Sequence, residues 1–224
     1  DAPGMSTQAL GVAINMHASQ GEVWQRSGRM AEAEAALLRG LPILQRALAQ
    51  DAKDSWTLAS AVSLHGLHAR ILGNNPAFAS LGRWQDACAA AQRASDAALA
   101  TLAADPANRY GPDTLAFTLG EQGQCALTAG RTDDAEDLFL RQVALRELMA
   151  VRFPDDMDFR YQRGVARGAL ARVWLAQGRH AQALAMLDEA GLITRQAAAA
   201  DAGNEAATPR LQALQALRLE GLVQ

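Results

Sequence analysis

Histidines and cysteines are the side chains of this sequence whose chemistry could serve catalysis or metal binding, because they act as general bases, nucleophiles and ligands. His65 and His68 stand three residues apart, a spacing that places two imidazoles on one face of a helix. No Asp, Glu or Cys accompanies them between residues 55 and 73, and a metal site needs three or four ligands. We therefore expect both histidines to pack in the interior or lie on the surface, and we predict no metal site.

The remaining titratable residues form no catalytic arrangement. His17 and His180 have no neighbouring nucleophile or orienting carboxylate, so the sequence contains no visible triad. The glycines follow no predicted strand, which excludes the usual phosphate-binding loops. The acidic cluster at 133–137 is typical of the first turn of a helix, where carboxylates interact favourably with the helix dipole. The sequence therefore predicts no catalysis and no cofactor.

The two cysteines, Cys88 and Cys125, lie in different repeats of the sequence and form no CxxC pair. Because free cysteines pack as small hydrophobic side chains, we favour two buried, reduced thiols. A disulfide or a reactive thiol is the alternative.

Net charge and hydropathy narrow the classes of partner. A net charge of -3 and a pI near 5.8 leave no basic surface for nucleic acid. The sequence has no run of about 18 or more apolar residues that could span a bilayer. It begins at Asp1 rather than Met, as a processed or truncated chain would, and no secretion signal is visible. We expect a cytoplasmic protein that binds neither nucleic acid nor membrane.

One short phrase recurs four times and organises the rest of the chain. Its copies are GRMAEA at 28–33, GRWQDA at 82–87, GRTDDA at 130–135 and GRHAQA at 178–183. Their spacing of about 48 residues indicates stacked supersecondary units. Alanine and leucine dominate the hydrophobic residues, while aromatics make up only 5%, so we expect helical units rather than strands.

Each repeated glycine is expected to end a helix, because glycine adopts the left-handed conformation of a helix C-terminus without strain. The predicted helices span about 6–28, 30–52, 55–72, 84–104, 112–129, 132–153, 157–177, 180–200 and 206–222. Pro42 falls inside the second of them and predicts either a kink or a break.

The second copy of the phrase is displaced by an insertion. Alignment with the third copy ends the third helix at Gly73 and leaves residues 74–82 as an extra segment. A segment inserted between packed helices must lie on the surface. We favour Phe78 and Leu81 packing back onto the neighbouring helices, and a contact loop is the alternative.

These landmarks resemble the tetratricopeptide repeat (TPR). That family has Gly at the turn, Ala five residues later, a small residue seven before the turn and an aromatic four before it. Here the Ala positions are Ala33, Ala87, Ala135 and Ala183, and the small residues are Gly21, Gly66, Gly123 and Ala171. The aromatic is present as Trp24 and Trp174, and is Ala69 and Ala126 in the middle copies. The long period is similar to that of the repeats found in some bacterial multidomain signalling proteins.

The resemblance implies an all-α fold, a right-handed α–α superhelix of four helical hairpins in a single domain over 1–224. The repeats would cover about 6–54, 55–108, 111–156 and 157–204, with a capping helix over 205–222. The resemblance also implies a protein–protein interaction module without catalysis, whose concave groove is lined by the first helix of each pair.

The groove positions of the family, carried across, give a candidate site for a protein or peptide partner. They are Asn15, Glu22, Gln25, Ser60, Ser63, Leu67, Arg70, Phe117, Gln124, Leu127, Val165, Arg172 and Leu175. Apolar side chains supply contact area and arginines offer a fork for carboxylates, so an extended peptide or a partner helix with an acidic group would fit. The same residue types are also typical of a solvated helix face, or of a groove filled by the last helix or a second copy.

Self-association is the alternative function. Leu211, Leu214, Leu217 and Leu222 recur at nearly helical spacing in the last predicted helix. Terminal repeats need a cover, so this stripe is expected to cap the fourth repeat. A stripe left exposed would instead form a weak homodimer, as part of a larger bacterial signalling protein.

Overall fold

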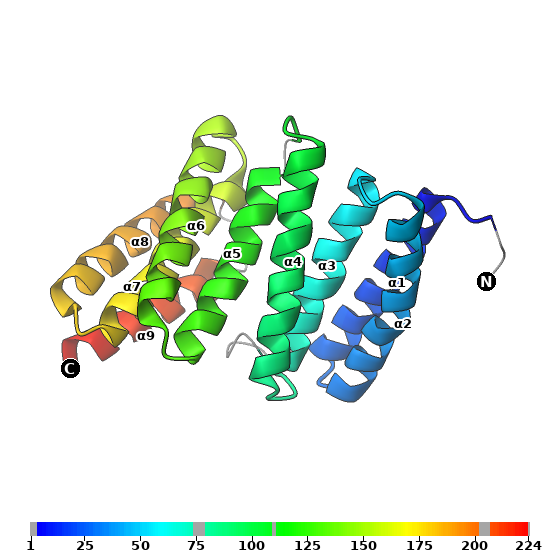
Figure 1. Cartoon of the computed structure of the whole chain (residues 1–224). Coiled ribbons are helices and arrows are strands. Elements are labelled where there is room, and N and C mark those ends of the chain that lie inside the picture. Colours follow the sequence, from blue (N-terminus) through cyan, green and yellow to red (C-terminus); the bar gives the residue numbers. More distant parts are fainter. Residues whose placement is uncertain (1–3, 74–78, 109–110, 202–206, 224) are drawn as a thin grey trace. The chain divides into compact units, whose positions relative to one another are not determined.

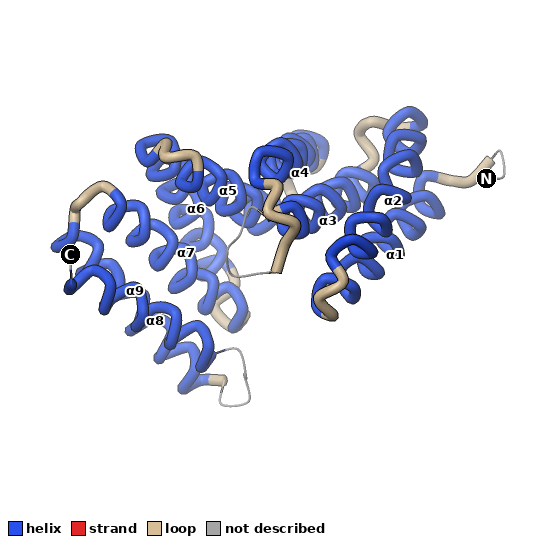
Figure 2. The backbone as a smooth tube through the Cα atoms, turned by 90° about the horizontal axis from the view of Figure 1, so that it is seen from below, coloured by secondary structure: helices blue, strands red, loops and turns tan. Residues whose placement is uncertain are grey.

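The computed structural model describes residues 4–73, 79–108, 111–201 and 207–223 of the 224 in the sequence. In these ranges the regular secondary structure is helical, with no strand (Figure 2). In chain order the helices are α1 (Thr7–Arg26), α2 (Met30–Gln50), α3 (Ser55–Leu72), α4 (Trp84–Ala104), α5 (Gly111–Thr128), α6 (Thr132–Arg152), α7 (Met157–Ala176), α8 (His180–Ala200) and α9 (Ala207–Val223) (Figure 1). Every predicted helix is present with its ends within two residues of the expected ones, so the all-α prediction is confirmed.

The chain divides into two compact units, Asp1–Cys125 and Ala126–Gln224. In the first unit α1 packs on α2, α3 packs on α4, and α3 also lies against both α1 and α2 (Figure 1). In the second unit α6 packs on α7, α7 packs on α8, and α9 lies against α8 and α7. Contacts of this kind join sequence neighbours, as expected of stacked helical hairpins. The grouping of all four repeats into one domain stays a prediction.

The repeated glycines turn the chain between helices. The φ angle is 73° at Gly28 and 74° at both Gly130 and Gly178, which is the left-handed region open to glycine. The backbone N–H that follows each of these glycines donates to a carbonyl in the last turn of the preceding helix, as in the 2.8 Å bond from Arg179 to Trp174. The predicted helix-ending role of these glycines is confirmed.

α3 ends where the alignment of the repeats predicted, just before the insertion. Gly73 caps α3 with a φ of 127°, and the N–H of Arg83 donates to the carbonyl of Leu72 at 2.7 Å. The chain therefore leaves the end of α3 and returns to it before α4 begins. Leu81 is half-buried against the hydrophobic core, as we favoured. Phe78 lies outside the described residues.

Pro42 does not divide its helix. α2 runs continuously from Met30 to Gln50 with Pro42 inside it. Of the two outcomes that the sequence left open, a break is excluded.

The small residue before the first turn, Gly21, lets α1 and α2 cross closely. A Cβ atom placed on Gly21 would stand 2.7 Å from Cδ2 of Leu37 and 3.3 Å from the backbone oxygen of Ala33. Leu37 and Ala33 follow the same turn, so the pattern read from the sequence corresponds to direct contacts between α1 and α2. A larger side chain at Gly21 would push the two helices apart.

The arginine of the repeated phrase forms a local side-chain pair in all four copies and reaches the preceding hairpin in two of them. Each copy bonds to the side chain three residues later, in the pairs Arg29–Glu32, Arg83–Asp86, Arg131–Asp134 and Arg179–Gln182. Two copies also reach the preceding hairpin, where Arg83 pairs with Glu34 and Arg179 pairs with Glu136, each at 2.7 Å. Both glutamates stand six residues after the preceding turn glycine. We call this pairing between hairpins the ionic clamp.

The clamp in the second unit is extensively hydrogen-bonded. The Glu136 carboxylate accepts hydrogen bonds from Nε1 of Trp174 at 2.8 Å, Nε2 of Gln177 at 3.0 Å and Nη1 of Arg179 at 2.7 Å. Burial acts to raise the pKa of Glu136, but the hydrogen bonds from Trp174, Arg179 and Gln177 outweigh it and the pKa is lowered. The carboxylate is therefore held in its charged form.

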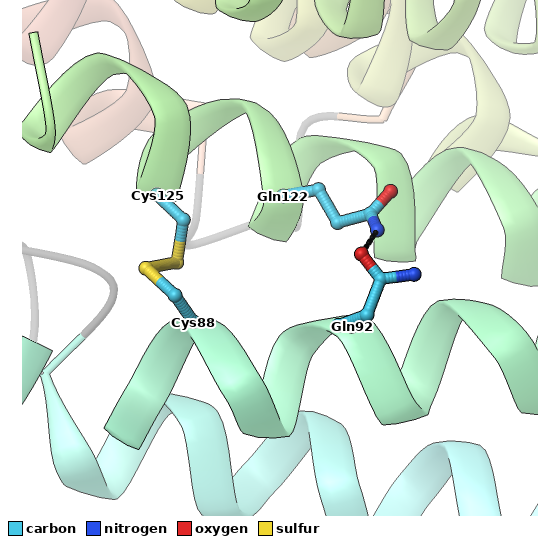
Figure 3. Close-up of a disulfide and its surroundings, with 4 residues drawn as sticks. All are labelled: Cys88, Gln92, Gln122 and Cys125. Carbon is cyan, nitrogen blue, oxygen red and sulfur yellow. Dashed lines mark hydrogen bonds between the residues drawn. A yellow bond between two sulfur atoms is a disulfide. The ribbon is translucent and has the colours of Figure 1, made fainter. Parts of the chain in front are cut away.

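A disulfide between Cys88 of α4 and Cys125 of α5 stands in place of this clamp between the second and third hairpins (Figure 3). Cys88 stands six residues after Gly82, in the position that glutamate occupies at the two clamps. The Cα atoms of the two cysteines are 5.5 Å apart, within the usual range for a disulfide. The expectation of two reduced thiols is therefore wrong. No short motif signalled the pairing, because the two cysteines are 37 positions apart in the sequence and the packing of α5 beside α4 brings them together.

The last helix covers the fourth hairpin. Leu214 is buried and Leu217 half-buried in a cluster that includes Leu175, whereas Leu222 is 55% exposed. A Cβ atom placed on Gly168 would stand 2.6 Å from Cδ2 of Leu214, so the absence of a side chain there allows α9 to approach α7. The leucine stripe therefore serves largely as a cap, as expected.

Candidate functional site

A hollow of about 550 Å³ opens on the first unit, between residues of α1, α3 and α5. It is lined by Asn15, Ala18, Ser19, Glu22, Val62, Ser63, Leu67, Arg70, Asp113, Thr114 and Phe117. Six predicted groove residues are among them, namely Asn15, Glu22, Ser63, Leu67, Arg70 and Phe117. We call this feature the unit-1 hollow. The first helices of three successive hairpins contribute to it.

Helical periodicity places these side chains on one face. On α3, Ser63, Leu67 and Arg70 follow the i, i+4, i+7 spacing of a single helical face. Gly66, on the same helix, lets α5 approach, because a Cβ atom there would stand 3.1 Å from the ring of Phe117. The aromatic ring therefore rests against the backbone of α3 and forms one wall of the hollow.

Arg70 and Phe117 lie near each other in the unit-1 hollow. The guanidinium carbon of Arg70 lies 6.0 Å from the centroid of the Phe117 ring, within reach of a cation–π attraction. Leu67 is buried beside them at 4% exposure. Two carboxylates, Glu22 and Asp113, also line the hollow. An arginine fork beside an apolar wall is suited to recognising a peptide.

A second hollow of about 600 Å³ adjoins the first one along α1. It shares Asn15 and Ser19 with the unit-1 hollow, and its lining includes Val12, Met16 and Trp56. These three apolar side chains are 49%, 68% and 50% exposed. Exposed apolar side chains that cluster on a surface mark interaction sites. We call this neighbouring feature the apolar extension.

No protein-family model matches the chain, and no curated protein sequence matches it either. Solved structures do match. A crystal structure of a variant of nearly identical TPR-like repeats, assigned to a kinesin light chain of Podosopora anserina, aligns with a TM-score of 0.55 and 16% identity over 94% of this chain and 97% of that chain. A second structure of these repeats aligns with a TM-score of 0.55 and 16% identity over 92% and 95%. The chain has a TPR-like fold. At this identity the likeness concerns the fold alone.

Other predicted groove residues of the TPR-like first unit lie outside the lining of the unit-1 hollow. Gln25 is only 8% exposed, and its Nε2 has no hydrogen-bond partner among the described residues. Ser60 is buried, and its hydroxyl donates to the backbone carbonyl of Trp56 at 2.9 Å. Gln124 is half-buried on α5.

The last four groove candidates, Leu127, Val165, Arg172 and Leu175, belong to the second unit. Leu127 packs against a core cluster, and Leu175 is buried in the cluster beneath α9 with Leu214. Val165 is 41% exposed and Arg172 is half-buried. Their part in a ligand groove stays a prediction.

Five residues of the lining were missed by sequence reasoning, namely Ala18, Ser19, Val62, Asp113 and Thr114. Asp113 and Thr114 stand one turn before Phe117 on α5, so helical periodicity counted back from Phe117 would have found them. Trp56 was also missed. It packs against Gly11 of α1, and no residue pattern signalled that contact.

His65 and His68 face the interior of the first unit. His68 is 7% exposed, with its Nε2 3.7 Å from Oε1 of Glu34. Burial lowers the pKa of His65 to about 4, and burial also lowers the pKa of His68 against the attraction of the Glu34 carboxylate. Within the described ranges, no three His, Cys, Asp or Glu side chains gather closely enough to hold a metal ion. No helix in those ranges is both long and apolar enough to cross a membrane.

Proposed function

We propose that the chain is a protein-interaction module without catalysis, and that the unit-1 hollow binds an extended segment of another protein. The observation that carries the proposal is the convergence of six predicted groove residues from three helices on one hollow. TPR-like repeats are generally protein-interaction modules, which agrees with this assignment.

The lining of the hollow defines the chemistry of the segment. Among the described residues of the lining the cationic side chain is Arg70, and a guanidinium can bond to a carboxylate in bidentate geometry. An apolar side chain of the segment would pack on Leu67 and Phe117, while Asn15 and Ser63 could bond to its backbone. A further apolar residue would reach the apolar extension. The proposed ligand is therefore an acidic peptide with two apolar anchors.

A peptide-library selection tests this proposal. Peptides selected on the wild-type chain should carry Asp or Glu, and their affinity is then measured by isothermal titration calorimetry. Because a hydrogen bond to a charged group contributes about 1.5–3 kcal/mol, Arg70→Glu should weaken binding by at least about tenfold.

Arg141→Glu provides the matched control. Arg141 is exposed on α6 in the second unit, so the same charge reversal there should leave the affinity unchanged. Failure to select any peptide, or equal loss in the two variants, would refute a binding role for the unit-1 hollow.

Self-association through α9 is the second candidate function. Three apolar side chains of α9 are exposed although the helix caps the fourth hairpin. They are Leu219 at 63%, Leu222 at 55% and Val223 at 87% exposure. Exposed apolar side chains at the end of a helix could meet a second copy. Sedimentation velocity over a range of concentrations decides the matter, since a mass that stays constant at the monomer value contradicts self-association.

The cytoplasm and a bacterial multidomain signalling protein remain the proposed setting. Cytosolic disulfides in mesophilic organisms are usually transient, and they serve catalysis or redox sensing. A cytoplasmic location therefore requires that the Cys88–Cys125 bond open and close under cellular conditions.

A further inference from the structure

The disulfide lies in a buried cluster of small side chains that α3 and α4 largely supply. The buried cluster there consists of Ala69, Leu72, Ala87, Ala90, Ala91 and Cys125. The corresponding cluster around α1–α3 contains several leucines and isoleucines, and the one around α6 and α7 contains Phe139. Alanine buries far less apolar area than leucine or phenylalanine, so the apolar contact immediately around the disulfide is small.

The ionic clamp is also replaced at this contact. The position that carries Glu34 and Glu136 at the clamps carries Cys88 here, and its partner is Cys125 of α5. One turn from the disulfide on each helix, Nε2 of Gln122 donates to Oε1 of Gln92 at 2.7 Å (Figure 3). A covalent bond thus stands where the other hairpins use a charge pair and large apolar side chains.

We propose that the Cys88–Cys125 disulfide is a reversible lock that controls the unit-1 hollow. Phe117, Asp113 and Thr114 on α5 supply one side of the hollow, and Phe117 lies about two turns from Cys125 on the same helix. Closing the lock fixes α5 on α4 and completes the hollow. Opening it removes the covalent tie between α5 and α4, so that side of the hollow loosens. The control of binding rests on the function proposed above; the lock itself does not.

The chemistry of opening is thiol–disulfide exchange with a cellular dithiol reductant. Cys88 is partly exposed whereas Cys125 is buried, so the reductant thiolate attacks the sulfur of Cys88. The bond between the two cysteines breaks, a mixed disulfide forms on Cys88, and Cys125 leaves as a thiolate that takes up a proton. The second thiol of the reductant then displaces the Cys88 sulfur. Two electrons and two protons pass to the protein, and the reductant becomes a disulfide.

Hydrogen–deuterium exchange of the full chain tests the lock without any ligand. The oxidised chain, the chain reduced with dithiothreitol, and Cys88→Ala/Cys125→Ala are compared, and alkylation with mass measurement confirms the thiol state of each. Amides of α5 from 113 to 125 should exchange at least about tenfold faster in the reduced chain and in the double variant, while α1 and α2 stay unchanged. Equal protection of α5 in the oxidised and reduced chains overturns the proposal, as does an air-oxidised chain with two free thiols.

A second measurement tests the link to binding. Peptides selected on the oxidised chain should bind the reduced chain at least about tenfold more weakly, and reoxidation should restore the affinity. Unchanged affinity with faster exchange of α5 would overturn the control of the hollow. If no peptide binds the oxidised chain, the proposed function fails instead, and the exchange experiment still decides whether the lock exists.

Discussion

Removal of the disulfide should cost the first unit a large part of its stability. Cys88 and Cys125 are separated by 37 residues, and both lie in the unit that spans Asp1–Cys125. In the chain-entropy model, a closed loop of this length destabilises the unfolded state by about 4 kcal/mol relative to the folded one. The alanine-rich contact around the bond offers little apolar burial to compensate.

The expected change in melting temperature follows from the size of the unit. An unfolding entropy of about 2.1 cal/mol/K per residue gives roughly 0.26 kcal/mol/K for a unit of this length, so 4 kcal/mol corresponds to about 15 °C. Differential scanning calorimetry of the oxidised chain and of Cys88→Ala/Cys125→Ala measures the shift directly.

The redox state supplies the control for this experiment. Dithiothreitol should lower the wild-type transition to that of the double variant, and it should leave the variant unaffected. An unchanged melting temperature of the wild-type chain after reduction would refute the reasoning, because the loop closure would then contribute nothing to stability.

Three further substitutions test other parts of the fold. Glu136→Gln should cost about 1–3 kcal/mol by chemical denaturation, because it removes the acceptor charge of the ionic clamp, while Asp134→Asn at an exposed pair should cost less than about 0.5 kcal/mol. Burial lowers the pKa of His65 from 6.5 to about 4, so the unfolded chain takes up a proton first as the pH falls. Stability should therefore drop by about 2 kcal/mol between about pH 7.5 and 5, and His65→Gln should flatten that part of the pH profile. Leu214→Ala should cost about 2–4 kcal/mol and raise proteolysis of α9, since its side chain is 8% exposed beneath the cap. A pH profile identical in His65→Gln and wild type, or a neutral Leu214→Ala, would contradict these assignments.

Local chemistry made the helices predictable. Glycine in the left-handed conformation marks the helix ends at Gly28, Gly130 and Gly178, and a single residue type carries that information. Pro42 was harder to interpret, because a proline inside a helical pattern is compatible with a continuous helix once tertiary packing holds both sides. Its effect depends on neighbours that the local sequence does not name.

Contacts between hairpins could be predicted from the sequence only in part. The pairing of Cys88 with Cys125 depends on the register of α5 beside α4, which no short motif encodes. A signal did exist in the repeat itself. Glu34 and His68 occupy the same two positions, counted from their turn glycines, as Cys88 and Cys125, and Nε2 of His68 lies 3.7 Å from Glu34. Comparing equivalent positions between copies would have placed the cysteines side by side.

The hollow itself was predictable to the extent that it follows the helical period. Ser63, Leu67 and Arg70 share one face of α3, and the repeat pattern placed all three. The apolar extension was not foreseen, because it depends on Trp56 packing against Gly11 across two helices. Such contacts depend on helix spacing, which the sequence pattern leaves undetermined.

Quantitative affinity capture from a lysate of the organism that encodes the chain tests the central claim most directly. Wild type, Arg70→Glu and the control Arg141→Glu are immobilised after circular dichroism shows equal helicity, and the captured proteins are compared by mass spectrometry. The account predicts a protein retained by wild type and Arg141→Glu, lost by Arg70→Glu, and displaced by the selected acidic peptide. Equal capture by all three, insensitive to the peptide, would contradict a binding site in the unit-1 hollow.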